Sequence, residues 1–374
     1  MTNSIKVADE SVKLTPADPQ AHQARAIVLY NLRRPTDAAQ EMEIAVSLRP
    51  QDDYLWLELA GLREAAGNTD AALAAFDRAI AFAPYYGHTY WQRGNFLVRL
   101  GRYEEGFKDL RIAVSSNRDF LPALIDLAWG VSRGDARIVE QLIQVGDDKT
   151  RLVFAHFLAR HGKVTETLDQ FRQISSPIAP EIRDDLIRFL IQHKAYSEAH
   201  EIWKRDRAET WLVTNGGFES DLVLDDLGFG WQATKLSGVG LALDVNQPHS
   251  GSRSLRIFFE GYENQERPVL SQMFLVHPGQ KYRVQFAVRT RDLVTGGLPV
   301  VTVTDAATGQ IMANSETIRA SANEWINLSF DFHTLPASKA VSLNLQRNRC
   351  SSSPCPIFGQ VWIDTVLIDE AGPK

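Results

Sequence analysis

Asp53–Pro84 reads DYLWLELAGLREAAGNTDAALAAFDRAIAFAP, two apolar helical patterns that are joined at Gly67 and end at a proline. Pro16, Pro50 and Pro84 recur every 34 residues, and each ends a pattern of this kind. Small residues at fixed places let two antiparallel helices approach closely, while the glycine allows the turn and the proline ends the second helix. The period therefore predicts a stack of helical hairpins.

The 34-residue pattern resembles the tetratricopeptide repeat. In the quoted unit, its signature positions are filled by Trp56, Leu59, Ala60, Ala72, Phe76 and Ala79. The resemblance is clear over residues 19–118 and degenerate over residues 119–206, which implies a helical repeat domain over residues 1–208. Because Pro16 already closes a unit, the chain starts inside a second helix, and we expect the natural protein to extend further toward its N-terminus.

Repeats of this family imply a concave face, made by the first helices, that binds a segment of a protein partner. On the repeat register this face is expected to carry Tyr30, Tyr54, Leu57, Trp91, Asn95 and Arg99. The alternative is that some of these side chains pack against the next repeat. The basic and Asn pattern of the carboxylate-clamp subclass is incomplete, so we do not predict a ligand that is a chain-terminal acid.

From Leu212 onward the pattern alternates between apolar and polar residues, as in KYRVQFAVR (281–289) and WINLSFDFH (325–333). Short runs of this kind, separated by Gly, Pro, Asn and Asp, predict an antiparallel β-sandwich or jelly roll over residues 209–374. The core positions of the two quoted runs are expected to be Tyr282, Val284, Phe286, Val288, Ile326, Leu328, Phe330 and Phe332. The expected fold class is multidomain α plus β, an α–α solenoid followed by a sandwich.

Four short motifs follow one another along this part of the chain: Asn215–Glu219 (NGGFE), Ser250–Ser252, Pro278-Gly279 before Tyr282, and Trp362–Asp364. This order resembles the jelly-roll carbohydrate-binding modules of the family 4/9 type, within the galactose-binding-like fold, over about residues 210–370.

The resemblance implies a structural Ca²⁺ held by Glu219, Asp364 and main-chain oxygens of the segment around Ser250, because calcium prefers oxygen ligands. The alternative is that the two carboxylates accept main-chain hydrogen bonds and hold no metal.

The same resemblance implies a sugar site on a concave sheet, with planar polar groups beside flat aromatic rings. The polar positions are expected at Gln272, Arg283, Gln285, Arg289 and Gln346, and the stacking positions at Tyr262, Trp231 and Trp325. Three alternatives stay open. Trp231 packs under the first hairpin, the polar row is a solvated face, or the sandwich contacts protein and never sugar.

The two cysteines, Cys350 and Cys355, are separated by four residues in a Ser/Pro loop. A zinc site needs about four ligands, and redox pairs usually have a shorter spacing, so we expect a small disulfide, with two free thiols as the alternative. A disulfide favours a periplasmic or envelope location. The opening MTNSIKVADE lacks a signal-peptide core and indicates the cytoplasm, unless the chain start is truncated.

Composition excludes several other functions. The net charge is −6 without a run of Lys or Arg, so we expect no nucleic-acid partner, and no apolar stretch is long enough to span a membrane. No phosphate-binding loop, nucleophile elbow, zinc-protease or dinucleotide motif occurs, so we expect no catalysis. The sequence predicts a scaffold that binds a protein and a carbohydrate, by analogy in exopolysaccharide or envelope assembly. The alternative is a purely protein-binding adaptor.

Overall fold

The structure is a computed structural model that describes residues 2–205, 207, 212–222, 227–233, 236–263, 267–320, 322–351 and 353–371. The expected domain boundary at 208/209 lies outside the described residues. Within them, thirteen α-helices precede nine β-strands, which confirms the predicted fold class. The chain divides into two compact units, Met1–Val153 and Phe154–Lys374.

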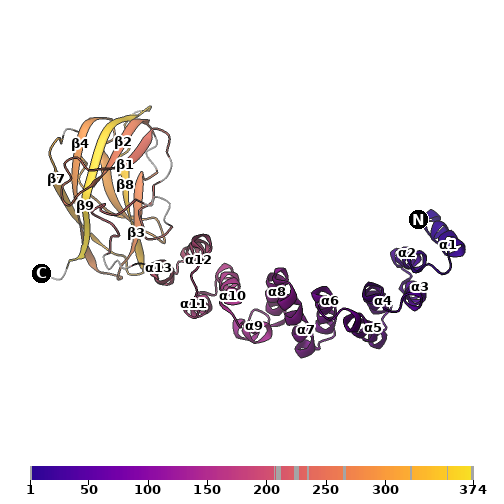
Figure 1. Cartoon of the computed structure of the whole chain (residues 1–374). Coiled ribbons are helices and arrows are strands. Elements are labelled where there is room, and N and C mark those ends of the chain that lie inside the picture. The colour runs from indigo at the N-terminus through magenta and orange to yellow at the C-terminus, as the bar shows by residue number, and fades with distance from the viewer. Residues whose placement is uncertain are drawn as a thin grey trace. The chain divides into compact units, whose positions relative to one another are not determined.

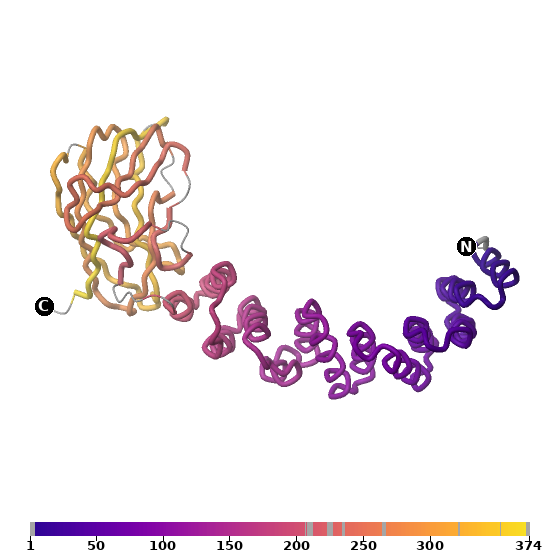
Figure 2. Tube along the Cα trace, in the orientation of Figure 1, coloured from indigo at the N-terminus to yellow at the C-terminus, as the bar shows by residue number. Residues whose placement is uncertain are grey.

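The first unit is a series of antiparallel helical hairpins, drawn from indigo to magenta in Figure 1. Its helices are α1 (Thr2–Leu14), α2 (Pro19–Asn31), α3 (Pro35–Leu48), α4 (Asp53–Ala65), α5 (Thr69–Phe82), α6 (Gly87–Arg99), α7 (Tyr103–Ser116), the 3₁₀ helix Arg118–Phe120, α8 (Leu121–Val131) and α9 (Ala136–Ile143). The unit boundary falls inside α10 (Asp148–Arg160). The successive hairpins can be followed along the trace in Figure 2.

Local sequence sets where these helices begin and end. The side chains of Asp18 and Asp52 accept amide hydrogens at the starts of α2 and α4, which is the usual role of an N-cap carboxylate. Gly67 and Gly101 turn the chain between paired helices with φ of 78° and 77°, a conformation that side chains with a β-carbon rarely adopt. The repeat period therefore appears as helix, glycine turn, helix.

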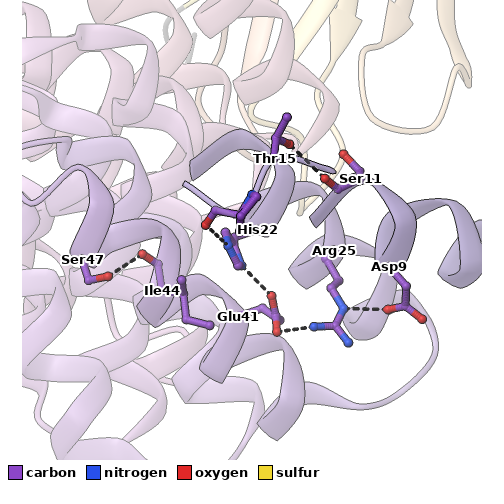
Figure 3. Close-up of polar contacts among 9 residues, drawn as sticks. Asp9, Ser11, Thr15, His22, Arg25, Glu41, Ile44 and Ser47 are labelled. Carbon is purple, nitrogen blue, oxygen red and sulfur yellow. Dashed lines mark hydrogen bonds and ion pairs between the residues drawn. The ribbon is translucent and has the colours of Figure 1, made fainter. Parts of the chain in front are cut away.

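Small residues bring the paired helices together, as the repeat pattern predicts. Ala26, Ala38, Ala60 and Ala72 are all fully buried, at 0% exposure. Polar contacts join the first three helices, and Figure 3 shows Arg25 of α2 between a carboxylate of α1 and one of α3. These bonds tie neighbouring helices across the stack.

The second unit contains the remaining helices and the sandwich. Its further helices are α11 (Val164–Arg172), α12 (Pro180–Gln192) and α13 (Tyr196–Lys204). Its strands are β1 (Val239–Asp244), β2 (Ser254–Tyr262), β3 (Leu270–Leu275), β4 (Lys281–Val294), β5 (Pro299–Asp305), β6 (Ile311–Asn314), β7 (Ile326–His333), β8 (Ala340–Arg347) and β9 (Ile357–Glu370).

Two antiparallel sheets form the sandwich, in the orders β1-β2-β9-β4-β7 and β3-β8-β5-β6. The last strand, β9, lies at the centre of the five-stranded sheet between β2 and β4 (Figure 1). The predicted inward face of β4 is confirmed, because Tyr282, Val284, Phe286 and Val288 are all buried. In β7 only Phe332 is fully buried, and the other three predicted core residues are partly buried against the same core.

Two glycines of the helical unit provide a matched test of helix packing. A β-carbon on Gly94 would lie 2.8 Å from Leu110 Cγ and 2.9 Å from the main-chain oxygen of Gly106, whereas one on Gly61 would meet nothing within 4 Å. We expect Gly94→Ala to destabilise the protein by about 1–3 kcal/mol through overpacking. We expect Gly61→Ala to stabilise it by up to about 1 kcal/mol through helix propensity.

The measurement is the urea midpoint followed by helical circular dichroism of the full chain. Equal effects of the two substitutions would contradict the close approach of α6 and α7.

Candidate functional site

A groove opens between α2 and α4 in the helical unit. It has a volume of about 620 Å³ and is lined by Ile27, Tyr30, Met42, Glu58, Gly61, Leu62, Glu64 and Ala65. Ile27 and Tyr30 are 46% and 48% exposed, so apolar surface is available for contact. We call this feature the helical groove.

Carboxylates give the helical groove a polar edge. Glu58 accepts a hydrogen bond from Gln23 at 2.6 Å, and its charge raises the pKa of the Tyr54 phenol. Glu64 is paired with Arg99 of α6 at 2.6 Å. The groove therefore joins apolar side chains to hydrogen-bonding groups, which suits an amphipathic protein segment.

The predicted partner-binding residues divide into two sets. Tyr30 lines the groove, and Tyr54 and Arg99 are exposed on α4 and α6. The prediction that Leu57 is exposed on the partner-binding face is wrong. Leu57 is 4% exposed and packs in the helical core, because it lies on the inner side of α4.

Trp91 and Asn95 make contacts within the helical unit. The Trp91 ring stacks on Phe120 with centroids 4.7 Å apart, which matches the alternative that it packs against the following repeat. Asn95 donates to the main-chain oxygen of Trp91 at 2.8 Å. Neither residue lines the helical groove.

Of the eight residues that line the helical groove, sequence reasoning predicted only Tyr30, and Ile27, Glu58 and Gly61 are among the seven that it missed. Ile27 precedes Tyr30 by three positions, and Glu58 and Gly61 follow Tyr54 by four and seven. Residues at these separations share one face of a helix, so the period held the signal.

A second groove lies on the outer face of the four-stranded sheet. It measures about 560 Å³ and is lined by Pro268, Thr302, Thr304, Gly309, Ile311, Asn314, Asn344, Gln346, Arg347, Asn348 and Arg349. Thr302 of β5 pairs directly with Asn344 of β8. Asn344 Nδ2 donates to Thr304 Oγ1 at 3.0 Å, which fixes the amide across the two strands. We call this feature the sheet groove.

Thr302 is the unusual member of the sheet groove. Its side chain is 1% exposed, and its Oγ1 is buried without a hydrogen-bond partner among the described residues. Burying a hydroxyl without a partner costs about 1–3 kcal/mol.

One predicted sugar-binding residue, Gln346, lines the sheet groove, and two others point into the core. Tyr262 is 5% exposed within the apolar core. Gln272 is 1% exposed, and its amide accepts from the Thr214 amide and donates to the Thr214 carbonyl, both at 2.9 Å. These two positions are corrected, because Gln272 shares the inward phase of its apolar neighbours on β3.

The remaining predicted polar residues, Arg283, Gln285 and Arg289, all belong to β4 in the five-stranded sheet. Arg283 and Gln285 are exposed, and Arg283 is paired with Asp331 at 2.7 Å. Arg289 is 6% exposed, because the segment after β1 covers it. They therefore do not share the face of Gln346.

The predicted stacking residues also lie elsewhere. Trp325 donates its indole hydrogen to Gln247 O at 2.9 Å, and the Arg289 guanidinium lies over its ring. Trp231 is buried, stacks on Phe218 and donates to Asn215 O at 3.1 Å, as its packing alternative predicts. No aromatic residue is among the described residues that line the sheet groove.

The motif carboxylates meet at one turn. Asp364 accepts from the amides of His249, Ser250 and Thr365, and it is fully buried, which raises its pKa. Glu219 accepts from the amide and hydroxyl of Ser252, a hydrogen bond that lowers its pKa.

Gly251 is needed between these two carboxylates. A β-carbon on Gly251 would lie 2.2 Å from Glu219 Oε1, and the residue has φ of 65°. Glu219 also accepts from the Arg253 amide. The turn thus presents amide hydrogens to both carboxylates.

This arrangement does not fit a calcium cage. A carboxylate has about four acceptor positions, and three protein donors bind each of Glu219 and Asp364. Calcium needs about 6–8 oxygen ligands. No group of three or more His, Cys, Asp or Glu suited to a metal occurs among the described residues. Calcium binding stays a prediction, and the hydrogen-bonded alternative fits these contacts better.

The cysteines form the predicted disulfide, Cys350–Cys355, with Cα atoms 6.3 Å apart. Arg347 lies beside it, buried at 3% exposure. Its guanidinium donates to Cys355 O, Tyr262 O and Thr295 Oγ1 at 2.7–2.8 Å. The disulfide loop therefore borders the sheet groove, which Arg347 also lines.

Asp364 provides a test of the turn. We expect Asp364→Asn to destabilise the protein by about 1–3 kcal/mol, because one acceptor oxygen becomes a donor facing main-chain amides. We expect the same melting temperature in excess EDTA and in millimolar Ca²⁺, for both the original protein and the variant. A melting temperature that rises several degrees with Ca²⁺ and falls with EDTA would instead demonstrate the cation.

No family model and no curated protein matches this sequence. Solved structures that match parts of it include a family 4 carbohydrate-binding module, with 13% identity, TM-score 0.33, and coverage of 42% of this chain and 99% of that chain. MamA, a tetratricopeptide-repeat protein, has 14% identity, TM-score 0.34, and coverage of 45% and 87%. A family 61 module in complex with β-1,4-galactotriose has 16% identity, TM-score 0.31, and coverage of 44% and 100%. The chain is thus similar in parts to members of the two families that its sequence patterns resemble, at a level that carries no functional argument.

Proposed function

We propose that this chain is a non-catalytic scaffold with two binding surfaces. The helical groove binds a segment of a protein partner, and the sheet groove binds a saccharide. The observation that carries the saccharide half is the set of amide and hydroxyl side chains that line the sheet groove. Sugars present many hydroxyls that both donate and accept, and such a surface can bind them.

Support for the protein half is the mixture of apolar and polar side chains in the helical groove. Ile27 and Tyr30 offer exposed apolar surface, and Glu58 and Glu64 offer acceptors. Helix-lined grooves of this kind bind amphipathic segments through apolar anchors, with polar contacts at the edge.

The second candidate is an adaptor that binds proteins only. The observation that favours it is the lack of an aromatic residue among the described residues of the sheet groove, because sugar sites commonly use stacking. The disulfide supports an oxidising compartment for either function. A role in exopolysaccharide or envelope assembly would use both surfaces, and it remains part of the proposal.

A glycan array with the full chain tests the saccharide half. We expect binding, and we expect Gln346→Ala to weaken it about 2–10-fold, the effect of losing one hydrogen bond. The matched control is Gln285→Ala, because Gln285 is an exposed glutamine on the other sheet. Loss of binding in the control variant alone would place the site on the other sheet. No binding to any glycan would favour the adaptor.

Peptide display against the full chain tests the protein half. We expect selected peptides to lose at least about tenfold in affinity for Gly61→Leu, because the new side chain fills the helical groove. Gly130→Leu is the control: a β-carbon there also meets nothing within 4 Å, and Gly130 lies on α8 away from the groove. Equal affinities for the two variants would show that the peptides bind elsewhere.

A further inference from the structure

One end of the sheet groove is basic. The residues that line it include Arg347 and Arg349 and no Asp or Glu. The Val269 amide donates to Leu345 O at 2.8 Å, so the start of β3 runs antiparallel to the end of β8. Arg267 precedes Val269 by two residues in the segment that enters β3. Three arginines therefore belong to adjoining chain segments at this end.

The buried arginine of this group, Arg347, donates to no carboxylate among the described residues, although the charge of Glu263 acts on it and partly offsets the lowering of its pKa by burial. All the hydrogen-bond acceptors of Arg347 among the described residues are uncharged: main-chain oxygens, a threonine hydroxyl and the cysteine sulfurs. Arg349, two residues further on, is exposed and forms no ion pair within the described part of the chain. Arg349 therefore gives this end of the groove one cationic group that is accessible to solvent.

Neutral sugars gain little from such a surface. A hydrogen bond exchanged with water contributes only about 0.5–1.5 kcal/mol, and the described lining residues supply no aromatic platform. Hydrogen bonds from a guanidinium to a carboxylate are roughly twice as strong as neutral ones, and they are directional because two parallel N–H groups face two oxygens. A ligand that carries carboxylates would use both the amides and the basic end.

We propose that the sheet groove selects polysaccharides that carry carboxylates, the polymers of uronic acids. Arg349 binds a carboxylate at the basic end, while Asn344 and Gln346 bind the hydroxyls of neighbouring units. This inference rests on the proposed saccharide function and names the class of ligand.

The test compares two forms of one polymer, polygalacturonate and highly methyl-esterified polygalacturonate, by isothermal titration of the full chain. The two share their backbone and differ in charge. We expect the acidic form to bind at least about tenfold more tightly, and we expect this preference to shrink as NaCl rises from about 50 to 500 mM because the charges are screened.

Arg349→Gln should reduce the preference to less than about threefold and leave the melting temperature unchanged, since Arg349 is exposed. Arg283→Gln is the matched control, an exposed arginine on the five-stranded sheet, and it should keep the full preference.

Other outcomes separate the two proposals. Equal binding of the two polymers would overturn the inference and leave the saccharide function standing. Binding of neither polymer, with no glycan bound on an array, would overturn both. Dextran sulfate that binds as tightly as polygalacturonate and is equally sensitive to Arg349→Gln would show attraction to any polyanion, which also overturns the selection of carboxylates.

Discussion

The distance at which two backbones can approach depends on the side chains between them, and glycine sets that distance in both units. Gly94 lets α6 lie against α7, because a β-carbon at this residue would lie only 2.9 Å from the main-chain oxygen of Gly106. In the sandwich, a β-carbon on Gly216 would lie 2.1 Å from Val366 O. That contact holds the NGGFE segment on β9, and Glu219 then reaches the turn at Gly251. A close approach of two backbones at a glycine thus holds elements together in each unit.

Most of the fold could be predicted from local periodicity in the sequence. The 34-residue period predicted the helical hairpins, because spacing of small residues alone determines which helices pair. The alternation of apolar and polar residues predicted the inner face of β4, because successive side chains of a strand point to opposite faces of the sheet. Leu57 was misplaced because the repeat register assigns a helix face broadly, and a leucine at its edge gains more from burial in the core than from exposure.

The binding residues of the sandwich needed information that no local pattern contains. Alternation says which side chains share a face of one strand, but pairing across long loops decides which strands share a sheet. Arg283 and Gln346 both face outward, yet they lie on different sheets. Gln272 was a local error, since it alternates in phase with Leu270 and Phe274. Thr302 and Thr304 alternate with Val301 and Val303, which lie in the core. The sequence could therefore have predicted that the two threonines face outward, but not which strands lie beside them.

The position of β9 has a consequence for synthesis of the protein. Each helical hairpin forms from residues close together in sequence, so it can fold as soon as it leaves the ribosome. The five-stranded sheet cannot, because its central strand, β9, is the last to be made, and β2 and β4 have no partner between them until Glu370 is synthesised. The strands that precede β9 therefore wait with open hydrogen-bonding edges, and chaperones that cover such edges would act on this part of the nascent chain.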